Sequence, residues 1–168
     1  SDTIELDYNN GATAAQATRA ITGTGIDGAF LTISDEDTYD YGNQYQTLTT
    51  DKTFTVTNSG AATATSIAVG APAMAAPYGF KGGTIPGTGG TCGSSLSGGL
   101  TCTLVVTFSP TAAGVASNTV RLSYNDGVSS QSSTRAITGT GVGYAALSIS
   151  DGATYSFGSG YISTTTTD

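Results

Sequence analysis

Residues 119–138 read TVRLSYNDGVSSQSSTRAIT, and this stretch decides the fold class of the 168-residue chain. Val120, Leu122 and Tyr124 alternate with polar residues, a pattern that predicts a β-strand with one buried face. The Asn-Asp-Gly sequence at 125–127 predicts a tight turn, because these residues tolerate positive φ at low cost. Residues 135–138 then supply the returning strand. The stretch therefore predicts an antiparallel β-hairpin.

Further strands are expected on both sides of this hairpin. Residues 31–34, 53–58, 66–70 and 101–108 alternate or run apolar, with a weaker signal at 78–80. Gly is abundant, only 10% of the residues are charged, and β-branched residues and Tyr supply most of the bulk. About seven short strands in roughly 110 residues predict an all-β protein, an immunoglobulin-like antiparallel β-sandwich.

The sequence also repeats itself with an offset of 116 residues. Residues 18–25, TRAITGTG, return unchanged at 134–141. Residues 6–11, LDYNNG, return as LSYNDG at 122–127. Eight residues between Leu31 and Tyr45 recur between Leu147 and Tyr161 with the same offset and no gap. A fixed period of this kind is typical of tandem repeat proteins.

The repeat divides the chain into three parts. Residues 1–28 match the C-terminal strands of a preceding repeat, 29–143 form one complete repeat, and 144–168 match the N-terminal strand region of a following one. Neither partial piece contains the middle strands, so the two together could not rebuild a domain. We expect a stretch of a longer array, with strand exchange between identical subunits as the rival hypothesis.

Three segments in combination resemble the choice-of-anchor D family of bacterial immunoglobulin-like repeats. They are TFTVTNSG at 53–60, the glycine-rich 82–92 leading to CTLVVTFSP at 102–110, and LSYNDG at 122–127 leading to TGTG at 138–141. The resemblance covers essentially the whole repeat. It implies a sandwich fold in a secreted or surface-exposed multidomain bacterial protein without an enzymatic site, and it carries over no catalytic residue.

Charge narrows the range of partners. Twelve acidic and five basic residues give a net charge of −7, and the basic residues are scattered along the chain. Because no basic patch offsets phosphate repulsion, neither nucleic acid nor an anionic membrane surface is an expected partner. No apolar run is long enough to span a membrane, so direct membrane insertion of this segment is not expected.

Cys92 and Cys102 are the only cysteines. In a secreted all-β chain, two cysteines first predict a disulfide. A zinc site is the alternative, but the chain has no His and only two thiolates. A redox pair usually has the closer Cys-x-x-Cys spacing, and free thiols stay open as a third possibility.

We expect no enzyme and no cofactor. The absence of His removes the commonest general base, and no Ser or Thr has an evident activating partner. Calcium has weak candidates in Asp35, Glu36, Asp37 and Asp40. In the second copy, Glu36, Asp37 and Asp40 become Gly152, Ala153 and Ser156, so a solvated acidic loop is favoured over a metal site.

An aromatic group recurs next to each expected domain junction. Its members are Tyr39, Tyr41 and Tyr45 in one copy and Tyr155, Phe157 and Tyr161 in the other. Packing of one repeat on the next is the favoured role, and sugar binding is the alternative.

The expected function is structural: a non-enzymatic repeat of a bacterial extracellular or cell-surface fibre, with neighbouring repeats or identical subunits as partners. The alternatives are an adhesin module that binds a glycan or a host or cell-surface protein, and a subunit that polymerises by strand exchange. The long, glycine-rich segment 70–92 is where a binding loop is expected.

Overall fold

The chain is all-β in a computed structural model that describes residues 1–150 and 152–159. No helix occurs among those residues, so none of them forms a helix that could cross a membrane. The strands are β1 (Asp2–Asn9), β2 (Ala14–Ile21), β3 (Leu31–Ile33), β4 (Thr38–Tyr45), β5 (Thr50–Asn58), β6 (Ala64–Val69), β7 (Tyr78–Phe80), β8 (Ser95–Leu96), β9 (Thr101–Phe108), β10 (Gly114–Asn125) and β11 (Ser130–Val142).

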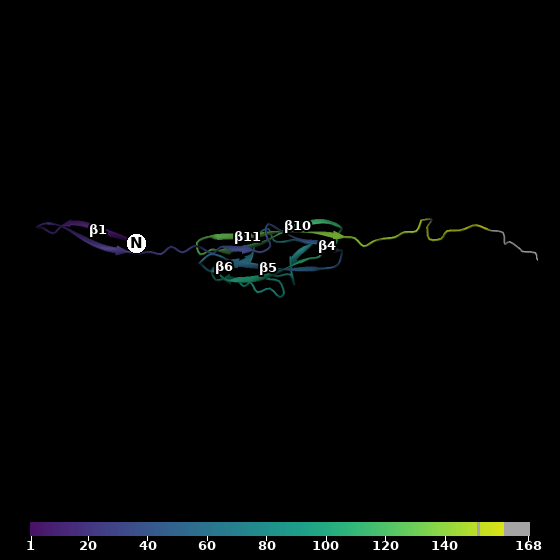
Figure 1. The fold of residues 1–168 in the computed structure, drawn as a ribbon, viewed down its shortest axis with the longest axis horizontal. Helices are drawn as coiled ribbons and strands as arrows, with labels where there is room; N and C mark the ends of the chain where they lie inside the picture. Colours follow the sequence, from purple (N-terminus) through teal and green to yellow (C-terminus); the bar gives the residue numbers. More distant parts are fainter. Residues whose placement is uncertain (151, 160–168) are drawn as a thin grey trace, which may run out of the picture.

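Strands β3 to β11 form a sandwich of two sheets, and β1 and β2 form a separate hairpin off one end of it (Figure 1). One sheet has the order β4-β11-β10-β6-β8, and the other has the order β3-β5-β9-β7. The C-terminal segment leaves the opposite end of the sandwich as an extended chain (Figure 1). The chain thus enters and leaves the sandwich at opposite ends of its long axis.

The strand order is that of an immunoglobulin-like sandwich. The β3-β5-β9-β7 sheet corresponds to the A-B-E-D sheet of that fold, and β6-β10-β11 corresponds to its C-F-G strands. Strand β4 adds to the outer edge of β11 in parallel, while the other strand pairs are antiparallel. The all-β class and the sandwich expected from the sequence are therefore confirmed.

The core lies between the two sheets, and its side chains all come from one continuous segment of the chain. Among the described residues, every buried hydrophobic side chain falls between Ala29 and Ile137. The largest fully buried side chains include Phe54, Phe108 and Leu104. Burying a side chain of this size contributes roughly 1.5–3 kcal/mol relative to leaving it exposed. Residues 29–143 therefore carry a complete core of their own.

The strand count differs from the sequence prediction. Residues 29–143, all of which are described, hold nine strands where about seven were expected. The two-residue β8 is too short to give a periodic signal. Strand β4 was missed because it contains polar residues and Gly42, whose φ of 70° accompanies a register shift against β11 between Thr138 and Thr140.

Candidate interaction surfaces

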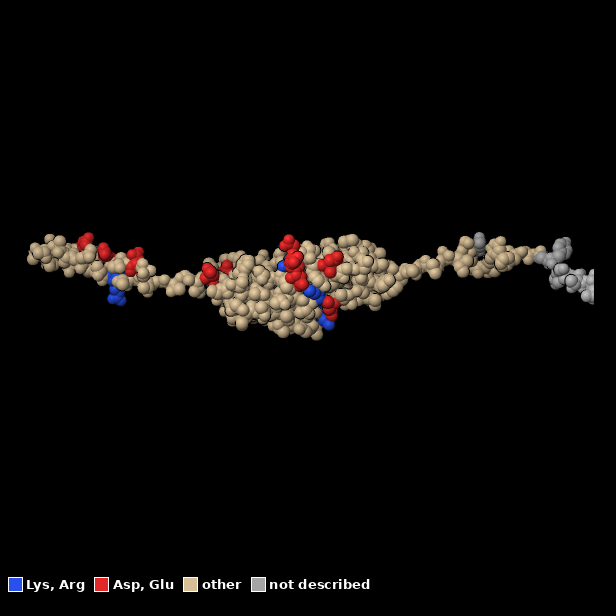
Figure 2. Space-filling model, viewed as in Figure 1, with Lys and Arg blue, Asp and Glu red and all other residues tan. Residues whose placement is uncertain are grey.

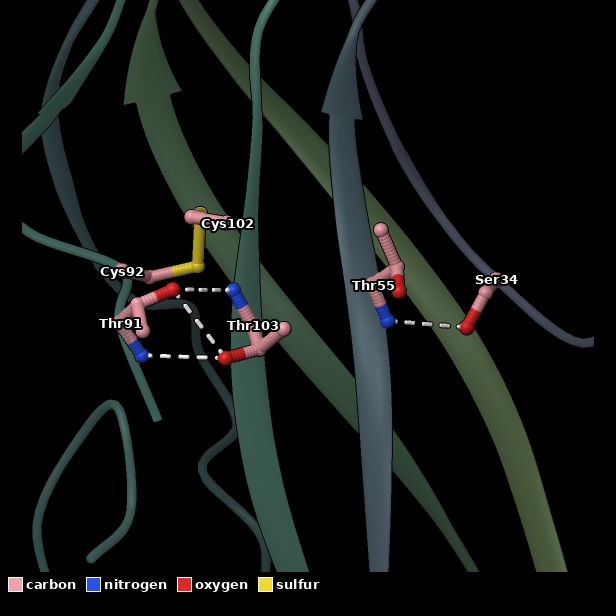
Figure 3. The surroundings of a disulfide bond; sticks show 6 residues. All are labelled: Ser34, Thr55, Thr91, Cys92, Cys102 and Thr103. Carbon is pink, nitrogen blue, oxygen red and sulfur yellow. Dashed lines mark hydrogen bonds between the residues drawn. A yellow bond between two sulfur atoms is a disulfide. The ribbon is translucent and has the colours of Figure 1, made fainter. Parts of the chain in front are cut away.

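The two cysteines form the disulfide that the sequence predicted. Cys92 and Cys102 lie 4.8 Å apart between Cα atoms, and both are buried. Next to them, Thr91 and Thr103 exchange hydrogen bonds: each backbone N–H donates to the other's Oγ1, at 3.1 and 3.0 Å (Figure 3). The disulfide joins the end of the glycine-rich segment to β9, and it encloses Leu96, which is buried in the core.

The acidic residues at 35–40 form a turn and the start of β4. Asp35 and Glu36 have positive φ values of 74° and 58°. One carboxylate oxygen of Asp35 accepts a hydrogen bond from Lys52 Nζ at 2.8 Å, and the other accepts one from the Ser34 hydroxyl at 2.7 Å. These two partners hold the pKa of Asp35 below its usual value. Asp40 Oδ1 accepts the N–H of Gly42.

This arrangement does not assemble the weak calcium candidates. The described residues contain no group of three or more acidic or Cys side chains placed to hold a metal ion. Asp35 has a lysine partner instead, and Glu36 and Asp37 are exposed. Figure 2 shows the acidic side chains of one face in small separate groups, with basic side chains beside some of them. Lys81 pairs with Asp51 at 2.7 Å.

Two tyrosines, the buried Tyr78 and the half-buried Tyr41, serve as hydrogen-bond donors inside the sandwich. Tyr41 Oη donates to the carbonyl of Val106 at 3.0 Å, and Tyr78 Oη donates to that of Ala116 at 2.9 Å. Burial raises the pKa of Tyr41 above its usual value and that of Tyr78 to about 12. Both phenols therefore stay protonated at neutral pH and fix strand positions.

The structure separates the aromatic residues that the sequence placed together at a junction. Tyr39 and Tyr41 are half-buried on β4 and pack against the core of their own repeat. Tyr39 meets Phe54 edge-on at 5.5 Å between ring centroids, and Tyr41 lies 5.6 Å from Phe108. Their contacts are thus within the sandwich, because β4 is a strand of its sheet and not a linker.

Of this first group, Tyr45 lies where the chain leaves the sandwich. Its ring stacks on that of Tyr144, with centroids 5.5 Å apart and planes 9° apart. In the second copy, Tyr155 and Phe157 are exposed and contact each other edge-on at 5.0 Å. Tyr161 lies outside the described residues.

Two hollows lie on the described surface of the sandwich. One of about 200 Å³ lies beside Pro77 and residues 110–116, and one of about 170 Å³ lies between Val69, Met74 and Phe80. The second belongs to the long segment 70–92. Small-molecule sites are usually ~300–1,000 Å³, so neither hollow has the size of a typical ligand pocket.

The hairpin β1–β2 reproduces the hairpin β10–β11 at the repeat offset. Asp2 pairs with Ile21 as Asn118 pairs with Ile137, and the whole register agrees. The turns agree too, since Gly11 N donates to the Asn9 side chain as Gly127 N donates to that of Asn125, both at 2.8 Å.

The two hairpins differ in what covers them. Val120, Leu122, Tyr124 and Ile137 of β10–β11 are at most 4% exposed. Their counterparts Ile4, Leu6, Tyr8 and Ile21 are 57%, 64%, 48% and 44% exposed. The hairpin β1–β2 therefore presents, without a partner, the apolar face that an equivalent hairpin buries in a sandwich core.

At the end where the chain enters, the sandwich binds the connecting segment itself. Ala62 N donates to the carbonyl of Asp27 at 3.1 Å, and Ala29 N donates to that of Asp126 at 2.9 Å. The exposed side chains of Phe30, Leu100 and Val128 lie at this end, which we call the entry pole.

At the opposite end, the chain leaves along β11. Gln46 N donates to the carbonyl of Val142 at 2.9 Å, and the Tyr144 hydroxyl donates to that of Gln46 at 3.0 Å. Exposed apolar side chains gather here as well. We call this set the exit pole, and its members are Tyr45, Leu48, Val115 and Tyr144.

Comparison with known proteins supports the fold and goes no further. No family model matches the sequence, and no curated protein matches it. The VesB protease of Vibrio cholerae has a TM-score of 0.52 at 15% identity, over 67% of this chain and 32% of that one. A PapD-like domain of human CEP192 has a TM-score of 0.48 at 11% identity, over 76% of this chain and 94% of that one. A protein of unknown function from Porphyromonas gingivalis has a TM-score of 0.40 at 13% identity, over 83% of this chain and 64% of that one.

The fold and its surfaces thus define a class: an immunoglobulin-like β-sandwich domain stabilised by a disulfide. At 15% identity the likeness to VesB shows the fold alone, and this chain spans about a third of that protein.

Proposed function

We propose that the chain is a non-enzymatic structural segment of a bacterial extracellular or cell-surface fibre, in which sandwich domains follow one another in a single polypeptide. Membership of the choice-of-anchor D family is part of this proposal. It rests on the sequence motifs at 53–60, 82–110 and 122–141.

The observation that carries the proposal is the uncovered hairpin β1–β2. Its register and turn match those of β10–β11, and its apolar residues stand at the positions that β10–β11 buries. A two-stranded hairpin on its own is at best marginally stable in water. We infer that its face is covered by the remaining strands of another sandwich.

Residues 144–150 and 152–159 support the same arrangement from the other end. Gly152 has a φ of 74° where its counterpart Glu36 has 58°, and Gly158 has 72° where Gly42 has 70°. These two glycines therefore repeat the positive φ of the equivalent positions in the sandwich, although the described residues of the segment form no strand. Leu147 and Ile149 are 99% and 93% exposed, whereas their counterparts Leu31 and Ile33 are buried.

A covalent array explains the two partial repeats, residues 1–28 and 144–168, better than strand exchange between small subunits does. Together they hold counterparts of β10, β11, β3 and β4. Strands β6 to β9 and the part of β5 after Lys52 have no counterpart in either segment, and they supply Phe54, Leu104 and Phe108 to the core. A sandwich assembled from the two segments alone would lack that half of its core, so we place the missing strands in adjoining repeats.

The disulfide and the surface charge support a location outside the cytoplasm. Disulfides persist in oxidising compartments, and the described cysteines include no free thiol. The acidic, weakly charged surface suits an exposed protein that must stay in solution.

Electron microscopy of the native secreted material, with a denaturing gel of the same sample, tests the proposal. We expect fibres with a longitudinal repeat on the order of 35–45 Å, the length of a sandwich at about 3.3 Å per strand residue. The gel should show a very large chain. Short chains on the gel would instead support subunits that polymerise by strand exchange.

Isolated monomers without fibres would overturn the fibre role. In that case, reproducible capture of a glycan or protein by residues 29–143 would support an adhesin module instead. The same capture assay with Met74→Ala, in the hollow of the long segment, would show whether that segment binds the ligand.

A further inference from the structure

The repeat offset allows the connection between two sandwiches to be followed residue by residue. Gly143, Tyr144 and Ala145 are the counterparts of Asp27, Gly28 and Ala29. At the entry pole, the carbonyl of Asp27 and the N–H of Ala29 are already hydrogen-bonded to the sandwich that follows them. Equivalent bonds would fix Gly143 and Ala145 to the next repeat.

Of these three residues, Tyr144 is also bound to the sandwich that precedes it. Strand β11 ends at Val142, whose carbonyl accepts the N–H of Gln46. Tyr144 stacks on Tyr45 and donates its hydroxyl hydrogen to the carbonyl of Gln46. The sandwich of residues 29–143 therefore holds the chain as far as Tyr144, while the next sandwich would hold it from Gly143. No residue is left over as a free linker.

We propose that Tyr144 is a joint shared by two repeats, and that the next repeat of the same chain docks its entry pole directly on the exit pole of this one. This inference rests on the proposed array. A Cβ at position 28 would meet the backbone oxygen of Asp126 at 3.2 Å and its Cβ at 3.5 Å. The first contact is tight, so the hairpin turn of the next repeat would shift by a few tenths of an ångström to accept the Cβ of Tyr144. The Cβ of Tyr144 thus faces the hairpin turn of the next repeat while its ring lies on Tyr45.

The character of the two poles fits this partner. Tyr45 and Tyr144 stay 51% and 60% exposed although they stack, so each ring keeps a face free. Val115 is 75% exposed at the same pole, and Phe30 and Val128 of the entry pole are 60% and 89% exposed. Apolar surface concentrated at both ends of an elongated domain is removed from water when the ends meet.

A two-domain protein tests the joint: residues 29–144 followed directly by a second copy of 29–143. Its junction keeps Gly143 and Tyr144, and Ala29 replaces Ala145 with the same residue type. Residual dipolar couplings measured by NMR report whether the two domains share one alignment tensor. Tyr144→Gly introduces the residue found at the equivalent position 28, and Tyr144→Phe keeps the ring without its hydroxyl. Val69→Ala, an exposed apolar residue of β6 away from both poles, is the control.

The expected result is one common tensor for the parent protein, for Tyr144→Phe and for the control, and its loss in Tyr144→Gly with both domains still folded. Separate tensors for two folded domains in the parent protein would overturn the shared joint. So would a Tyr144→Gly variant that keeps the common tensor. Neither of those results would bear on the gel test of the native chain, so the array and its joint can fail separately.

Discussion

The two hairpins of the chain, β1–β2 and β10–β11, have nearly the same structure but differ in their surroundings. They share strand register, turn type and the hydrogen bonds of the turn, although one lies in a sandwich and the other outside it. The two hairpins therefore share the geometry that their local sequence favours. What the outer hairpin lacks is the opposing sheet, and with it the burial that supplies most of the stability of a strand pair.

The largest contrast is expected from truncating the same leucine in both hairpins. Leu122→Ala should lower the free energy of unfolding of the sandwich by about 2–5 kcal/mol, because it opens a cavity at a fully buried position. Leu6→Ala should leave it unchanged within about 0.5 kcal/mol, since Leu6 is 64% exposed. Urea unfolding of the whole chain measures both. Equal losses would show that β1–β2 contributes to the same cooperative core.

The disulfide sharpens the comparison, because only the sandwich has one. Replacing Cys92 and Cys102 together by Ala should cost roughly 2–3 kcal/mol in the chain-entropy description of a short closed loop. Thermal unfolding with and without a reducing agent is the measurement. The double variant should be insensitive to the reducing agent, and hydrogen exchange of β1–β2 should not change in either case. A reductant effect that persists in the double variant would contradict this assignment.

Replacing the turn glycine by Ala should strain the turn to a similar extent in both hairpins. Gly127 and Gly11 have φ values of 104° and 95°, a region that costs an L-residue roughly 1–2 kcal/mol. Gly127→Ala should destabilise the sandwich by that amount in urea unfolding. Gly11→Ala should increase amide hydrogen exchange in β1–β2 and leave the sandwich unaffected. An unchanged exchange rate in β1–β2 would show that its turn relaxes freely.

The smallest effect concerns pH. The backbone N–H groups of Ser129 and Val128 hold the pKa of Asp126 below its ordinary 3.8, whereas Asn10 makes the same turn bonds with a neutral amide. A lowered pKa stabilises the folded state above the unfolded pKa, and this contribution is lost as the pH falls through the folded value. Asp126→Asn should therefore reduce the loss of stability between pH 7 and pH 3. Unfolding curves at both pH values measure the difference.

Part of that acid sensitivity should remain in the variant. Asp35 and Asp51 also have lowered pKa values, caused by Lys52 and Lys81 and by neighbouring hydroxyl groups. If Asp126→Asn unfolds with the parent's full pH dependence, the turn carboxylate has no share in it.

Features with a local signal were predictable from the sequence. The hairpin turn at 125–127 and the alternation in β5 and β9 each depend on residues that are neighbours in the chain, and so they were found. The disulfide was predicted because two cysteines in a secreted all-β chain usually pair. The 116-residue period is a comparison of the sequence with itself and needs no structure.

Other features depend on contacts between distant residues. Strand β4 is defined by its parallel pairing with β11, about 100 residues away in the chain, and nothing in its own polar sequence requires that pairing. The same pairing turns Tyr39 and Tyr41 towards the core and leaves Tyr45 at the exit. In the sequence, Asp35 belongs to an acidic cluster, and only the fold brings Lys52, 17 residues further on, next to it. The contact between Tyr144 and Tyr45 had no signal beyond the presence of two tyrosines.

The parallel pairing of β4 with β11 has a mechanical consequence. Ala136 pairs with Thr38 at one end of this ladder and Val142 with Tyr45 at the other, and the chain enters and leaves the sandwich at opposite ends. Tension applied along the long axis pulls β4 and β11 past each other along their own directions. The hydrogen bonds between them are then loaded in shear and must break as a group, whereas bonds opened from one end break one after another. In the proposed array, this pairing would let the sandwich resist a tensile load along its long axis.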